Sequence, residues 1–226
     1  MSETLLSVRN VSNTYISRPV FGKAEKNKVL NNVNLEVKKG EIFGLTGNSG
    51  CGKTTLAGCI LGLVNYEGGI FLNGQKCARG SVQIVFQDPG ASLNPVKKIG
   101  FLLEEPLVIN KKGNRIERRQ MVDRMLIRVG LDPSYKTRMP DELSGGQKQR
   151  VCIARSLITE PQLLIADEAI SSLDVSVAAQ ILNLFCRLNK NAGLGIIFIS
   201  HNINALEYLC GRIAVMEKGT IKNYIE

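Results

Sequence analysis

Four short, largely apolar runs divide the chain, and each ends in a polar or glycine-rich turn. They occupy residues 41–46, 82–86, 163–166 and 194–200. Apolar runs of this length, separated by stretches of helical periodicity, are typical of strands buried on both faces of a parallel sheet. The pattern therefore predicts an α/β fold with a mostly parallel sheet.

Two other patterns occur in the rest of the chain. Apolar and polar positions alternate in residues 5–11, 29–37 and 69–72, which predicts an N-terminal antiparallel β subdomain. Between residues 94 and 142 the periodicity becomes helical, and one stripe holds Val122, Met125, Leu126 and Val129. Because no repeat or linker interrupts the chain, we expect a single domain over residues 1–226, with 94–142 as a helical subdomain between 1–93 and 143–226.

Composition narrows the class of protein. Hydrophobic residues make up 44% of the 226 positions and charged residues 22%, as in ordinary soluble proteins. No window supplies the roughly 18 apolar residues that a spanning helix needs. The six cysteines form no CxxC pair and no secretory signal is visible, which together favour a reducing cytosol. The net charge of +9 favours acidic partners: phosphates, nucleic acid or an anionic membrane face.

A phosphate-binding loop follows the first apolar run. The pattern GxxxxGK[ST] is matched by Gly47, Asn48, Ser49, Gly50, Cys51, Gly52, Lys53 and Thr54, and Thr55 begins a helical pattern that extends to residue 63. Glycines let the backbone amides point inward, and the helix N-terminus adds positive potential. We expect Lys53 to reach the β- and γ-phosphates of a nucleotide and the Thr54 hydroxyl to ligate Mg²⁺.

Polar side chains follow three further strands. Asp167 and Glu168 end the run 163–166, Gln87 follows the run 82–86, and His201 follows the run 194–200. Ligands of open α/β sheets bind at the carboxyl ends of the strands, so these residues should face Lys53. Asp167 would hold Mg²⁺ and Gln87 would reach the metal or a water. Glu168 would act as general base and His201 would contact the γ-phosphate.

A second glycine-rich turn precedes the helical residues 151–157. It comprises Leu143, Ser144, Gly145, Gly146 and Gln147. The turn has two explanations: a helix N-terminus capped by its serine, or a second anion site. Because one nucleotide does not need two such sites in one subunit, the second explanation implies a head-to-tail pair of chains, in which Ser144 meets the ATP held by the partner's loop.

With these motifs in this order, the chain resembles the ATP-binding subunits of ABC transporters over nearly its whole length. The resemblance covers the phosphate loop, Gln87 of the Q-loop, the signature LSGGQ at 143–147, the pair Asp167 and Glu168, Asp174 of the D-loop and the switch histidine His201. It implies the ABC ATPase fold, a P-loop NTPase that uses ATP and Mg²⁺, and it places Tyr15 where the family has an adenine-stacking aromatic residue.

The sequences of residues 86–95, 151–157 and 167–176 resemble those of the ATPase subunits of peptide and nickel importers. Among these subunits, this chain is similar to the second, F- or E-type ATPase. The resemblance implies a second ATPase subunit, either a paralogue or a second copy, together with two membrane permeases and, indirectly, an extracytoplasmic binding protein. It implies a peripheral location at the cytoplasmic face of the membrane. The sequences DEAI and VCIARSL favour nickel or a metal chelate over dipeptides as the cargo.

The alternative is a soluble ABC ATPase that acts on DNA or ribosomes, which the positive charge would suit. The DNA-repair relatives place long coiled coils between the phosphate loop and the signature, and the ribosome-type members carry two ATPase halves in one chain. Here a short stretch separates Lys53 from Ser144 and one set of motifs is present. We therefore expect no nucleic-acid partner.

Overall fold

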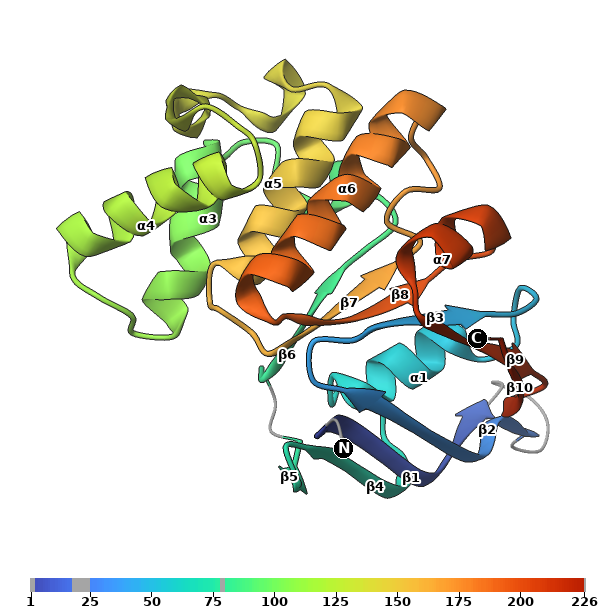
Figure 1. Cartoon of the computed structure of the whole chain (residues 1–226). Coiled ribbons are helices and arrows are strands. Elements are labelled where there is room, and N and C mark those ends of the chain that lie inside the picture. The colour runs from blue at the N-terminus through green and yellow to red at the C-terminus, as the bar shows by residue number, and fades with distance from the viewer. Residues whose placement is uncertain (1–2, 18–24, 78–79, 226) are drawn as a thin grey trace.

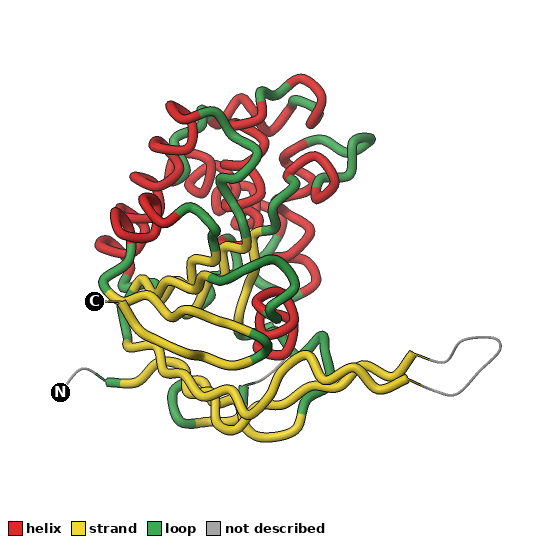
Figure 2. The backbone as a smooth tube through the Cα atoms, turned by 90° about the vertical axis from the view of Figure 1, so that its right-hand side faces the viewer, coloured by secondary structure: helices red, strands yellow, loops and turns green. Residues whose placement is uncertain are grey.

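The computed structural model describes residues 3–17, 25–77 and 80–225, and it arranges them in layers (Figure 1). An antiparallel sheet lies at the bottom of Figure 1, helix α1 (Lys53–Ile60) lies above it, and a larger sheet and the remaining helices follow. Figure 2 shows the same order from the side, with most of the helices above the two sheets. No helix in the described part of the chain has the length and apolar character needed to cross a bilayer.

The larger sheet confirms the predicted parallel strands. Among the described residues its order is β10-β9-β3-β8-β7-β6. Its members are β3 (Ile42–Thr46), β6 (Val82–Val85), β7 (Leu163–Asp167), β8 (Gly195–Ile199), β9 (Arg212–Glu217) and β10 (Thr220–Ile225). All neighbours are parallel except the antiparallel pair β9 and β10. The carboxyl ends of β3, β6, β7 and β8 therefore share one edge.

The central strands β3, β7 and β8 are buried along their whole length, and their side chains alternate between two cores. On β7, Leu163 and Ile165 pack with α1 and the antiparallel sheet, whereas Leu164 and Ala166 pack with the helices of the other face. All four side chains are fully buried. Burial of a leucine or isoleucine side chain stabilises a fold by about 1.5–3 kcal/mol, so both faces of the sheet contribute.

The antiparallel sheet is the predicted N-terminal one. It has the order β2-β1-β4-β5 in the described part of the chain. Its strands are β1 (Thr4–Ser17), β2 (Glu25–Lys38), β4 (Glu67–Leu72) and β5 (Gln75–Lys76). The long pair β1 and β2 projects beyond the rest of this sheet (Figure 2).

Residues 94–142 are largely helical, as predicted. They contain α3 (Ile99–Ile109), α4 (Arg115–Arg128) and the 3₁₀ turns η1 (Pro133–Thr137) and η2 (Pro140–Glu142). The predicted stripe is buried, with Val122, Met125, Leu126 and Val129 in the core. That these residues form a separate subdomain stays a prediction.

The other helices are α2 (Pro89–Ser92), α5 (Gly145–Leu157), α6 (Val175–Ala192) and α7 (Ile203–Leu209). Two helix boundaries differ from the sequence pattern. Helix α1 ends at Ile60 rather than residue 63, where Gly62 turns the chain with a φ of +70°. Helix α5 begins at Gly145, well before residue 151, because Ser144 caps it.

Candidate active site

The phosphate loop connects the end of β3 to the start of α1. Gly47 has a φ of +146°, and a Cβ atom there would lie 2.1 Å from the carbonyl oxygen of Met216. Gly50 and Gly52 also have positive φ values, +75° and +110°. The loop therefore needs glycine at these positions for its backbone path, as expected of a loop that turns its amides toward a ligand.

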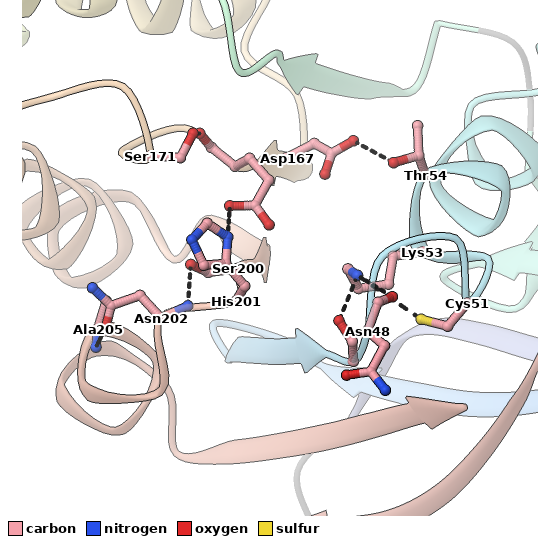
Figure 3. A network of polar contacts seen from close by, with 12 residues as sticks. Asn48, Cys51, Lys53, Thr54, Asp167, Ser171, Ser200, His201, Asn202 and Ala205 are labelled. Carbon is pink, nitrogen blue, oxygen red and sulfur yellow. Dashed lines mark hydrogen bonds and ion pairs between the residues drawn. The ribbon is translucent and has the colours of Figure 1, made fainter. Parts of the chain in front are cut away.

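Lys53 lies across this loop. Its Nζ donates to the carbonyl oxygens of Gly47 at 2.7 Å and Asn48 at 3.1 Å. The Sγ of the buried Cys51 lies 3.8 Å from the same nitrogen (Figure 3). The ammonium group is thus held at the mouth of the loop, where it can meet a phosphate.

Asp167 and Thr54 meet across the site. The Thr54 hydroxyl donates to Asp167 Oδ2 at 3.2 Å (Figure 3). Burial raises the pKa of the Asp167 carboxyl, the hydrogen bond from Thr54 partly offsets this rise, and the charge of Glu168 adds to it. Hydroxyl, amide and carboxylate oxygens are ligands that Mg²⁺ prefers, so Thr54, Asp167 and Gln87 are a donor set that fits this ion.

Glu168 and His201 form a second polar pair. Glu168 Oε2 lies 2.9 Å from His201 Nδ1. The Oε2 atom is buried, and apart from His201 it has no polar partner in the described part of the chain. Glu168 itself has a φ of +51°, a conformation that is strained for a residue with a side chain. The backbone holds it there, since Glu168 N donates to Ile199 O at 3.0 Å and Ser171 Oγ donates to Glu168 O at 2.9 Å.

A cavity of about 380 Å³ joins these groups. The predicted residues in its lining are Gly47, Ser49, Gly50, Gly52, Lys53, Thr54, Thr55, Gln87, Asp167, Glu168 and His201. A cavity of similar volume, about 430 Å³, is lined by Leu157, Pro161 and Ala192 among others and contains none of the predicted residues. The strand ends therefore come together as expected, in one cavity that contains a cation, carboxylates and open backbone amides.

Asn48 and Cys51 of the phosphate loop do not line this cavity, and three further predicted groups lie outside its lining. Tyr15 is 47% exposed on the projecting part of β1, where it pairs with Asn27. Asp174 caps α6 by accepting from Val177 N at 2.9 Å, and this hydrogen bond lowers the pKa of its carboxyl. Residues 143–147 lie at the start of α5, where Ser144 and Gln147 cap the helix reciprocally. Ser144 is thus the N-cap of α5, as the first explanation of this turn requires, and the Ser144 side chain is exposed.

The sequence pattern misses one residue of the cavity, Val29 of β2. It also misses the support that Ser171 gives to Glu168. An ordinary strand valine carries no local signal of a ligand site, because only the packing of β2 against the loop brings it there.

Comparison with known proteins adds family information. The profile of a family described as ABC transporter matches residues 30–171. The chain is 39% identical to the probable D,D-dipeptide transport ATP-binding protein DdpF of Escherichia coli over 223 residues, which cover 98% of this chain and 72% of that protein. It is 42% identical to the oligopeptide transport ATP-binding protein OppF of Streptococcus mutans over 229 residues, 96% of this chain and 73% of that one.

Among solved structures, the ATP-binding cassette MJ0796 superposes with a TM-score of 0.83 at 29% identity, over 98% of both chains. That structure is described as the dimer of a post-hydrolysis state bound to ADP and Pi. The layers described above therefore match those of an ATP-binding cassette.

Proposed function

The chain belongs to the ABC transporter family as an ATP-binding, ATP-hydrolysing subunit, and on that premise we propose that it powers the import of di- or oligopeptides. The observation that carries the proposal is an identity near 40% with peptide transport ATP-binding proteins along nearly the whole chain. The cargo class of those relatives favours peptides over the nickel that the sequence wording suggested. They are transport proteins, and they give no support to a role on DNA or ribosomes.

In the proposed mechanism, the loop amides and Lys53 would hold the phosphates of ATP, and Thr54, Asp167 and Gln87 would hold Mg²⁺. Bound Mg²⁺ supplies positive charge that neutralises the phosphates. Glu168 accepts the proton of the attacking water through its carboxylate, which lines the cavity and whose Oε2 has no polar partner other than His201 among the described residues. His201, 2.9 Å from this oxygen, orients the carboxylate and contacts the γ-phosphate. Tyr15 approaches the adenine from β1.

We further propose that two ATPase subunits enclose the nucleotide. Residues 143–147 support this arrangement because they are held at the start of α5, outside the cavity lining, while the Ser144 side chain stays exposed. They would meet the ATP of the partner, either a paralogue or a second copy of this chain, and Asp174 would lie at the contact. The dimeric state of the similar cassette MJ0796 supports the same arrangement.

We propose that this chain lies at the cytoplasmic face of the membrane, with two membrane permeases as partners and an extracytoplasmic binding protein on the opposite side of the membrane. Motion caused by the nucleotide would pass from this chain to the permeases. Helix α5 contacts the segment after Gln87 at two points that support this route. Arg155 Nη1 donates to Ser92 O at 3.2 Å, and Cys152 Sγ lies 3.8 Å from Pro89 O. Displacement of Gln87 by a ligand would therefore be transmitted to the signature helix.

The test compares uptake of a labelled dipeptide and of labelled nickel in source cells that carry the intact chain or Glu168→Gln. We expect ATP turnover to fall about 10²–10⁴-fold with ATP binding retained, and dipeptide uptake to fall with it. Glu207→Gln is the matched control, because Glu207 is exposed on α7 outside the cavity lining.

Each contrary outcome overturns a different part of the proposal. Loss of nickel uptake alone would exclude peptides as the cargo and leave the ATPase mechanism in place. Loss of neither uptake would exclude the transport role, and ordinary hydrolysis by Glu168→Gln would exclude Glu168 as the base.

A further inference from the structure

Tyr135 of η1 contacts the signature turn, although no motif in the sequence points to it. Gln147 Nε2 donates to the Tyr135 hydroxyl oxygen at 3.0 Å. The two residues lie on different elements, since η1 follows α4 whereas Gln147 lies in the first turn of α5. The signature turn therefore has a support outside its own helix.

Gln147 uses both ends of its amide. Its Oε1 accepts from Ser144 N at 3.0 Å. Because a backbone N–H can only donate, the amide oxygen must face Ser144 and the NH₂ group must face Tyr135. The Tyr135 oxygen is thus the acceptor that fixes this orientation of the side chain.

Tyr135 is itself held in place. The Arg138 guanidinium carbon lies 4.0 Å from the centre of the Tyr135 ring, within the range of a cation–π contact. Lys136 Nζ bonds both carboxylate oxygens of Asp123, at 2.7 and 2.9 Å, which ties η1 to α4. Tyr135 also packs against the helical core. Its hydroxyl is therefore presented from a fixed ring.

The contact reaches Ser144 through Gln147. Gln147 N donates to Ser144 Oγ at 3.4 Å, so this oxygen is an acceptor toward its own helix. The hydroxyl hydrogen of Ser144 is therefore left to donate to another group, and the Ser144 side chain is exposed. A donor pointing outward at a helix N-terminus is suited to an anion such as a phosphate.

We propose that Tyr135 is a positioning residue for the signature turn: it holds Gln147, and through Gln147 it keeps Ser144 oriented toward the nucleotide of a second chain. The inference rests on the two-subunit arrangement proposed above. It adds a residue that acts on the partner's site without touching the nucleotide.

The experiment uses the transporter complex purified from source membranes through this chain. Tyr135→Phe keeps the ring and the Arg138 contact and removes only the hydroxyl. We expect kcat for ATP hydrolysis to fall about fivefold, the size of one lost hydrogen bond, with ATP affinity of the isolated chain unchanged. Tyr208→Phe is the matched control: it removes a hydroxyl that donates to Asn183 Oδ1 at 2.8 Å on α6, far along the chain from the signature.

A second variant separates positioning from general packing. In a Gln147→Leu background, Tyr135→Phe should reduce kcat no further, because its effect passes through Gln147. A full additional fivefold loss in that background would overturn the proposal, as would unchanged kcat for Tyr135→Phe alone.

Ser144→Arg distinguishes the positioning role of Tyr135 from the two-subunit site on which that role rests. If Ser144→Arg abolishes hydrolysis while Tyr135→Phe has no effect, the positioning role is wrong and the two-subunit site stands. If Ser144→Arg leaves hydrolysis intact, the two-subunit site is wrong, and the positioning role is wrong with it.

Discussion

Helices α1 and α5 both have glycines at their N-termini, but the first amides of the two helices are satisfied in opposite ways. The N-cap of α1 is Gly52, with a φ of +110°, and no side chain in the described part of the molecule caps it. The N-cap of α5 is Ser144, which forms a complete capping box with Gln147. The first amides of α1 are therefore left for a ligand, whereas α5 already has its caps from its own chain.

The glycines of the two turns also differ in purpose. Gly47 needs its positive φ and has no room for a Cβ atom beside Met216. Gly146 is helical, and a Cβ atom there would lie 2.5 Å from Val177 Cγ1 of α6. The phosphate loop thus uses glycine for an open backbone path, and the signature turn uses it for close packing of two helices. Similar residue types produce an anion cradle in one place and a rigid, self-capped surface in the other.

The largest expected difference between the two turns comes from replacing one glycine by alanine in each of them. Gly47→Ala should destabilise the chain by about 3 kcal/mol and weaken ATP binding at least about tenfold, since φ and space both exclude a side chain. Gly145→Ala is the matched variant, because the nearest atom to its Cβ would be Leu173 Cδ2 at 3.9 Å. Urea unfolding and titration with a fluorescent ATP analogue measure both. Equal losses in the two variants would show that the turns do not differ as described.

A smaller effect is expected at the cap of α5. Ser144→Ala should lower the free energy of unfolding by about 1 kcal/mol, the usual value of an N-cap, and should leave ATP affinity of the isolated chain unchanged. Ser144→Asn keeps a capping side chain and should restore the stability. Weaker ATP binding by the isolated Ser144→Ala chain would mean that the signature turn contributes to the site of its own subunit.

The smallest expected effect concerns Asp167, beside the open end of α1. Burial raises the pKa of its carboxyl in the fold, so the charged form destabilises the nucleotide-free chain at pH above that pKa. This loss disappears as the pH falls through the raised pKa toward the ordinary value near 4. Asp167→Asn should therefore raise the melting temperature at pH 8 without nucleotide, and the gain should vanish in acid.

Asp174→Asn is the control for this prediction, because hydrogen bonds from Val177 and Ser176 lower the pKa of Asp174 instead. It should show no gain at pH 8. Thermal melts at pH 8 and at about pH 4, near the ordinary pKa of a carboxyl, decide the matter. A gain for Asp167→Asn that grows in acid would contradict burial as the cause.

Local pattern was enough to predict the four strands that end at the site. The runs that form β3, β6, β7 and β8 were recognisable because burial between two cores makes most of their positions apolar. Their terminal side chains were predicted to meet because parallel strands end at one edge of a sheet. The phosphate loop was predicted for the same kind of reason, since its glycines serve the local backbone.

Contacts between segments that are far apart in the chain could not be predicted from local pattern. Val29 enters the cavity only because β2 packs beside the loop, and Tyr15 lies near the end of β1, where it pairs with Asn27 outside the lining. The start of α5 at Gly145 depends on whether Ser144 caps its own helix or stays free, and a sequence pattern allows both.

The sequence by itself determined the four apolar strands, the helical stretch 94–142, the phosphate loop and the set of polar residues at the strand ends, because these follow from periodicity and from short-range backbone chemistry. The tertiary structure decided which of those residues share a cavity, which helix N-terminus stays open, and that Tyr135 holds Gln147. The physical reason is that hydrogen bonds and packing between residues far apart in the chain depend on the three-dimensional path, which no local pattern encodes.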